Sequence, residues 1–153
     1  MSVLSIEGRS LVAGRGQGSL LHADLGLSFW GGVDPFSGEV IDRHHPLSGQ
    51  SLAGRVLAIP SGRGSCTGSS VLLELILNGP APAALVLAEP DEILTLGALV
   101  AEHVFDVQLP VLCIGHAAFA DLAAHAGASV RVDGTHLQVF DSEIESCGCS
   151  PTP

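Results

Sequence analysis

From residue 55 onward, short apolar runs alternate with longer segments of helical character. The runs RVLAIPS (55–61), AALVLAE (83–89) and LPVLCIG (109–115) are short and nearly continuous, as expected of buried strands. The segments between and after them, 69–79, 91–105 and 116–127, have the length and apolar spacing of helices. Such alternation predicts an α/β fold with a mainly parallel sheet covered by helices.

The ends of these elements carry recognisable signals. Gly79, followed by two nearby prolines, should end the first helix, and Asp91 can cap the start of the second. ASVRVDG and HLQVFD, joined through DGT, predict a closing hairpin. In the first third of the chain we expect a short apolar run (SLVAG), a glycine-rich link, a strand-like LGLSFW and a turn-rich GGVDPFSGEVID, but no long helix.

The length of 153 residues suits one domain, which we assign to residues 1–140, with a loose tail at 141–153. Charged residues make up only 14% of the chain, against about 25% in a typical soluble domain. Low charge fits a surface partly covered by another chain, or a bland surface rich in Gly, Ala and Ser.

Lysine is absent and the net charge is −10, so no large basic patch can form, and we expect no nucleic-acid and no membrane partner. No apolar run reaches the roughly 18 residues of a membrane span, and the first residues do not resemble a secretory signal. Cys66, Cys113, Cys147 and Cys149 form no paired zinc framework. We therefore expect a cytoplasmic protein with free thiols and no metal of its own, and leave the role of Cys147 and Cys149 open.

The segment PSGRGSCTGSS, residues 60–70, connects a predicted strand to a predicted helix. The first N–H groups of a helix have no internal partners and lie at its positive end, so a carboxylate or phosphate fits there. An arginine can hold a carboxylate with two parallel hydrogen bonds, and neighbouring backbone amides can steady the same charge. The predicted substrate-binding residues are Arg63, Gly64, Cys66 and Thr67.

Other interpretations of this segment stay open. Helix capping explains each hydroxyl taken singly, and Cys66 fits a structural thiol as well as a nucleophile. The segment lacks the lysine of a P-loop and the G-x-S-x-G of a nucleophile elbow. Its glycine spacing departs from the dinucleotide fingerprint, yet Glu89 ends the next strand, where a ribose-binding acid would lie. A non-catalytic dinucleotide- or small-molecule-binding module is therefore an alternative.

Four motifs, FWGGVDP, HPLSG, PSGRGS and NGPAPAA, occur in this order along the chain. In this combination the chain resembles the small subunit, or swivel domain, of aconitase X, from about residue 8 to residue 115. The resemblance implies a swivelling β/β/α domain with a mixed, barrel-like sheet flanked by helices. It thereby revises the mainly parallel sheet that the alternation alone predicts.

The resemblance also implies a function. Family members are hydro-lyases whose small subunit works with a larger aconitase X subunit, and the active site lies between the two. Iron or an iron–sulfur cluster is expected in that partner, not in this chain. The serine of the GRGS loop, here Ser65, is implied to be the proton acceptor. The known substrates are cis-3-hydroxy-L-proline and (R)-5-phosphomevalonate, and we expect the former, because this chain has few cations for a phosphate.

Asp34 and His45 are candidate supporting residues. Asp34 begins an Asp-Pro turn, and His45 matches the family's His-Pro; ordering of their own loops is the alternative for both. His103, His116, His125 and His136 show no ligand spacing, and His116 fits a residue at a helix start. Phe29 and Trp30 are expected to pack in the core or against the partner.

Overall fold

The apolar runs predicted to be buried strands form the parallel centre of one sheet. In the computed structural model, which describes residues 2–62 and 67–140, they are β4 (Val56–Ile59), β5 (Ala84–Leu87) and β6 (Val111–Cys113). Each strand pairs in parallel with the next. Every residue of β4 and β5 is buried, because both faces of the sheet are covered at this point.

Antiparallel strands complete the sheet on both sides of this centre. The order is β1-β8-β7-β3-β4-β5-β6-β2. The added strands are β1 (Ser2–Glu7), β2 (Arg9–Val12), β3 (Arg15–His22), β7 (Ser129–Asp133) and β8 (His136–Phe140). The β7–β8 hairpin turns at Gly134 and Thr135, as DGT predicts.

The two ends of the strand order meet. β1 and β2 are the edge strands of the order, yet only Gly8 separates them in the chain. Gly8 donates its N–H to the carbonyl oxygen of Thr135 (2.8 Å), and the next residue, Arg9, pairs with Cys113 of β6. The mixed, barrel-like sheet expected from the resemblance is confirmed, and the mainly parallel sheet predicted from the alternation alone is wrong.

The first third of the chain differs from its sequence-based assignment in two places. The glycine-rich link is β3, a strand of eight residues, and LGLSFW is mostly not a strand, because α1 (Phe29–Gly32) begins within it. In β3 the glycines permit close packing: a Cβ added at Gly16 would lie 2.1 Å from the Ala83 carbonyl oxygen, and one at Gly18 would lie 2.2 Å from that of Gly54. Here glycine marks close backbone approach within a strand.

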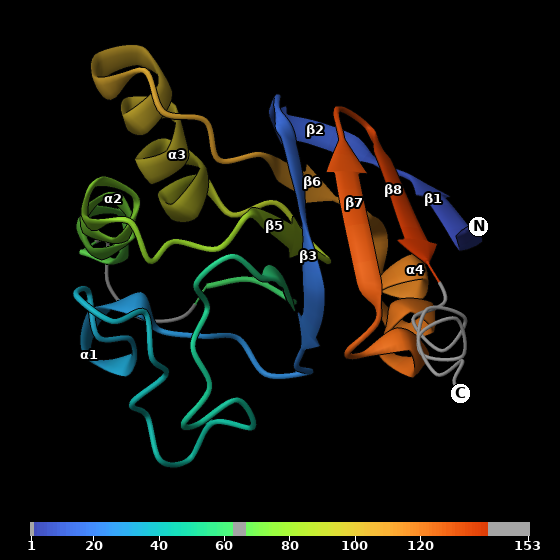
Figure 1. Cartoon of the computed structure of the whole chain (residues 1–153), viewed down its shortest axis with the longest axis horizontal. Coiled ribbons are helices and arrows are strands. Elements are labelled where there is room, and N and C mark those ends of the chain that lie inside the picture. The colour runs from blue at the N-terminus through green and yellow to red at the C-terminus, as the bar shows by residue number, and fades with distance from the viewer. Residues whose placement is uncertain (1, 63–66, 141–153) are drawn as a thin grey trace, which may run out of the picture.

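Helices cover both faces of the sheet (Figure 1). α2 (Gly68–Asn78) and α3 (Glu92–Phe105) pack on one face, where Leu57 and Leu85 belong to their apolar cluster. α4 (Gly115–Leu122), continued by a 3₁₀ turn at Ala123–His125, packs on the other face with the hairpin. The predicted ends are confirmed: Gly79 ends α2 in the left-handed conformation, and Asp91 caps α3.

Candidate functional site

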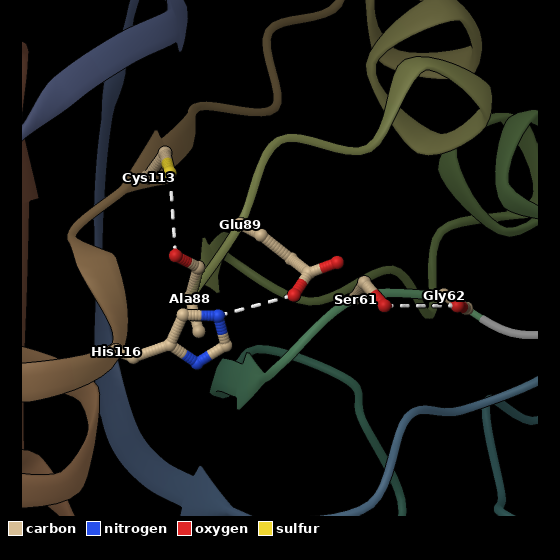
Figure 2. Close-up of polar contacts among 6 residues, drawn as sticks. All are labelled: Ser61, Gly62, Ala88, Glu89, Cys113 and His116. Atoms are coloured by element: carbon tan, nitrogen blue, oxygen red, sulfur yellow. Dashed lines mark hydrogen bonds and ion pairs between the residues drawn. The ribbon is translucent and has the colours of Figure 1, made fainter.

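The carboxyl ends of β4, β5 and β6 lie at one edge of the sheet, because the three strands are parallel. Ser61 and Gly62 follow β4, Glu89 follows β5, and His116 lies in the first turn of α4 after β6 (Figure 2). Ligands of open α/β sheets bind outside this edge. The predicted anion-binding loop leaves the sheet from the same place.

Hydrogen bonds hold the base of this loop. The N–H groups of Ala88 and Glu89 both donate to the carbonyl oxygen of Pro60, at 3.1 and 3.2 Å. Gly62 donates its N–H to Oδ2 of Asp91 (2.7 Å) and forms a bridge with Leu27. The chain therefore enters residues 63–66 from a position fixed by the neighbouring strand.

Asp91 holds two elements at once. Its Oδ2 accepts the Gly62 N–H, while its Oδ1 accepts the N–H groups of Ile93 and Leu94 (2.9 and 3.0 Å) at the start of α3. A Cβ at position 62 would lie 2.9 Å from Oδ2 of Asp91. Glycine at position 62 thus allows the carboxylate to approach the loop base closely.

The predicted catalytic and substrate-binding residues Arg63, Gly64, Ser65 and Cys66 lie outside the described residues, so their roles stay predictions. Thr67 is exposed and directly precedes α2, whose first residue, Gly68, is buried. A Cβ added at Gly68 would meet the Phe29 Cβ at 3.9 Å. The strand–loop–helix context of the predicted site is confirmed, with the positive end of α2 directly after the loop.

The two candidate supporting residues serve their own loops. Oδ1 of Asp34 accepts the N–H of Phe36 (2.9 Å) within the Asp-Pro turn. His45 is only 3% exposed; its Nδ1 accepts the N–H of Leu47 (3.1 Å), and its Nε2 lies 3.0 Å from the Leu25 carbonyl oxygen. Since Nδ1 accepts a hydrogen bond, the ring hydrogen lies on Nε2, which donates it to the Leu25 carbonyl oxygen. Both ring nitrogens are thereby used within the loop, and a role at the active site stays untested.

The sequence alone does not indicate that the side chains of Glu89 and His116 meet at this edge. Nε2 of His116 lies 3.1 Å from Oε2 of Glu89, and both side chains are exposed. Each lies at the carboxyl end of one of two adjacent parallel strands, β5 and β6. The strand order, once known, brings them together, although 27 residues separate them in sequence.

Two features are absent from the part of the chain that the structure describes. Within it, no three His, Cys, Asp or Glu side chains gather closely enough to hold a metal ion. None of its helices is both long and apolar enough to cross a bilayer. Cys113 is a free thiol, and its Sγ lies 3.7 Å from the carbonyl oxygen of Ala88.

Comparison with known proteins identifies the family. The model of the aconitase X swivel domain matches residues 5–139. The chain belongs to the aconitase X swivel-domain family. It is 32% identical to a chain of aconitase X from Thermococcus kodakaraensis in its holo form, with a TM-score of 0.79 over 90% of this chain and 99% of that one.

Two groups of relatives carry different names. The chain is 68% identical over 120 residues to cis-3-hydroxy-L-proline dehydratase of Pseudomonas aeruginosa and 52% identical over 118 residues to that of Hypocrea jecorina. These matches cover 78% and 77% of the chain but only 20% of each relative, so the chain spans about a fifth of their length. It is 44% identical over 98 residues to the phosphomevalonate dehydratase small subunit of Thermococcus onnurineus, covering 64% of the chain and 75% of that subunit.

Proposed function

We propose that this swivel domain is part of a hydro-lyase that dehydrates cis-3-hydroxy-L-proline, with Ser65 as the proton acceptor. The observation that carries the proposal is the 68% identity to a dehydratase of that name, against 44% for the phosphomevalonate subunit. A dehydration reaction also agrees with the membership of this chain in the aconitase X swivel-domain family.

Dehydration of a 3-hydroxy acid requires a base that removes a proton, stabilisation of the developing negative charge, and assistance to the departing hydroxyl. A serine hydroxyl is a poor base until its surroundings activate it. The loop ends where α2 begins, so the positive end of that helix favours an alkoxide or a bound carboxylate nearby. Arg63 would grip the substrate carboxylate with its planar fork.

A larger polypeptide completes the proposed active site. The dehydratase relatives contain about four fifths of their length beyond the region that this chain matches, and we assign the remaining substrate contacts to that part. Iron or an iron–sulfur cluster belongs there as well, where it would act as a Lewis acid on the departing hydroxyl. No step assigned to this chain uses the metal.

Phosphomevalonate dehydration is the second candidate. It is favoured by the relation to a separate small subunit, three quarters of which this chain covers. A third alternative, a non-catalytic dinucleotide-binding module, predicts that the isolated chain binds NAD. An assay of the assembled protein with both substrates, together with NAD titration of the isolated chain, separates the three.

The experiment that tests Ser65 uses the chain assembled with the larger aconitase X polypeptide. Ser65→Ala should lower kcat for cis-3-hydroxy-L-proline by about 10²- to 10⁴-fold, the usual contribution of a general base, with folding and assembly unchanged. Ser70→Ala is the matched control, because Ser70 is exposed on α2, and it should retain full activity. Near-normal turnover by Ser65→Ala would remove this serine from the mechanism.

A further inference from the structure

Among the described residues of the carboxyl edge, Glu89 and His116 form a pair that the proposed role of the serine loop does not explain. Glu89 follows β5, and its backbone N–H donates to the Pro60 carbonyl oxygen (3.2 Å), so it lies directly beside the base of the loop. In Figure 2 its side chain extends from the strand end across this edge, with His116 on one side and Ser61 on the other. The pair therefore borders the place where a ligand of the loop would lie.

Among the described residues, the Glu89 carboxylate has a hydrogen-bond partner at one oxygen only. His116 Nε2 contacts Oε2 at 3.1 Å. No other hydrogen-bond or ion-pair partner of this carboxylate occurs among the residues that the structure describes. The Glu89 side chain is 56% exposed and that of His116 is 71% exposed. His116 thus orients the carboxylate, and no described residue occupies Oε1.

Among the described residues around this edge, the charge is mostly negative. Glu89, Asp91 and Glu92 follow one another closely in sequence, and Asp91 is already engaged by three backbone N–H groups. An exposed carboxylate at such a place favours a cation over an anion. A hydrogen bond from a charged donor to a carboxylate is also stronger than one between neutral groups.

The two candidate substrates differ in the group that such a carboxylate recognises. A cyclic imino acid such as cis-3-hydroxy-L-proline carries a secondary ammonium next to its carboxylate. Phosphomevalonate has no cationic group and carries a phosphate, which a carboxylate repels. We propose that Glu89, oriented by His116, accepts a hydrogen bond from the ring ammonium of the substrate and so selects an imino acid over a phosphorylated hydroxy acid. This inference rests on the proposed function.

The test measures steady-state kinetics of the assembled enzyme. Glu89→Gln should raise KM for cis-3-hydroxy-L-proline by about tenfold to a hundredfold, the usual worth of a hydrogen bond to a charged group, with kcat changed much less. Glu92→Gln removes the same charge from the exposed first turn of α3 and should leave KM unchanged. His116→Gln should raise KM by a smaller factor, since it only positions the carboxylate.

A pair of inhibitors tests the ammonium itself. L-Proline and (S)-tetrahydrofuran-2-carboxylate share a five-membered ring and a carboxylate, but only L-proline carries the ammonium. The wild-type enzyme should bind L-proline more tightly than (S)-tetrahydrofuran-2-carboxylate. Glu89→Gln should bind the two compounds equally well. An unchanged KM or an unchanged preference in Glu89→Gln overturns the inference while the proposed function stands. Weaker inhibition by inorganic phosphate in Glu89→Gln than in the wild type would also overturn it, because the Glu89 carboxylate would then not be a group that repels a phosphate. Turnover of phosphomevalonate alone would overturn both.

Discussion

Among single residues, Asp91 has the widest influence on the candidate site. Its carboxylate accepts three backbone N–H groups, two at the start of α3 and one from Gly62 at the base of the loop. The helix cap is a local interaction, whereas the bond to Gly62 spans 29 residues and links two parallel strands. The two roles can therefore be separated by substitution.

Asp91→Ser should keep the cap and lose the link. A serine hydroxyl caps a helix about as well as aspartate, but its shorter side chain cannot reach Gly62 at the same time. We expect stability to fall by about 1–2 kcal/mol in urea denaturation, the cost of the lost hydrogen bond, while the Gly62 amide exchanges hydrogen faster and kcat of the assembled enzyme falls.

Asp91→Ala is the companion variant, because it loses both interactions. It should cost about 2–3 kcal/mol, the sum of a lost cap and a lost hydrogen bond to a charged group. If Asp91→Ser exchanges its Gly62 amide at the wild-type rate, the bond between these two residues does not hold the loop base.

The sequence predicts the helix cap of Asp91 but not its hydrogen bond to Gly62, and the reason is physical. A cap is readable because the acceptor and its donors lie within three residues of one another. The Gly62 bond depends on which strands are neighbours, and the same holds for Glu89 and His116 at the ends of β5 and β6. Residues that meet across a sheet edge become visible only with the strand order.

At the scale of elements, α3 lies close to α2 through Gly97. A Cβ added at Gly97 would lie 2.8 Å from the carbonyl oxygen of Ser69, in the first turn of α2. Because Gly97 has no side chain, α3 packs closely against the first turn of α2, which follows the loop (Figure 1). The start of α2, and with it the end of the loop, is thus positioned by helix packing.

Gly97→Ala should destabilise the domain, although alanine is the better helix former by about 1 kcal/mol. The new methyl group cannot fit against a backbone oxygen, so α2 and α3 must separate, and we expect a net loss of about 1–2 kcal/mol. Gly68→Ala is the matched control in urea denaturation. Its added Cβ would meet atoms of Ile93 and Phe29 at 3.8 and 3.9 Å, ordinary contact distances, and it should be neutral. Equal effects of the two substitutions would contradict the packing argument.

Glycine is also where sequence reasoning failed at this scale. The helices and buried strands after residue 55 were predicted correctly, because their apolar spacing and end signals are local. The sequence predicts a link in place of β3 because this segment contains Gly16 and Gly18, yet both glycines are needed for close approach of neighbouring backbone. Without the fold, a strand glycine that accommodates a neighbour looks the same as one that permits a turn.

At the scale of the whole molecule, exposed apolar side chains flank the candidate site. Leu96 is exposed on α3 and lines a groove of about 340 Å³ together with Leu11, Pro90 and Leu99. On the other side lies Trp30 in α1, 61% exposed, whereas its neighbour Phe29 is buried in the core. Of the two places expected for these aromatic residues, the core or the partner, the core is confirmed for Phe29. Trp30 does not pack in the core, and its packing against a partner stays a prediction.

The position of Trp30 links it to the site. Leu27 bridges Gly62, and Phe29 lies against Gly68, so the segment that carries Trp30 runs beside both ends of the loop. Phe36 offers a comparison, because it is 78% exposed but lies in the turn at which Asn78 Nδ2 donates to the Pro35 carbonyl oxygen, at the far end of α2. An α-helix of 11 residues is about 16 Å long.

If the larger polypeptide closes over the carboxyl edge of the sheet, Trp30 should contribute to binding and Phe36 should not. Trp30→Ser should raise the dissociation constant of the assembly at least about tenfold, as expected for a tryptophan at the centre of an interface. Phe36→Ser should leave it unchanged. Both isolated variants should keep wild-type stability within about 0.5 kcal/mol, because both side chains are exposed. Isothermal titration of each variant with the larger polypeptide measures the difference. A stronger effect at Phe36 than at Trp30 would place the interface at the opposite end of α2, away from the serine loop, and an active site shared across the carboxyl edge would then be excluded.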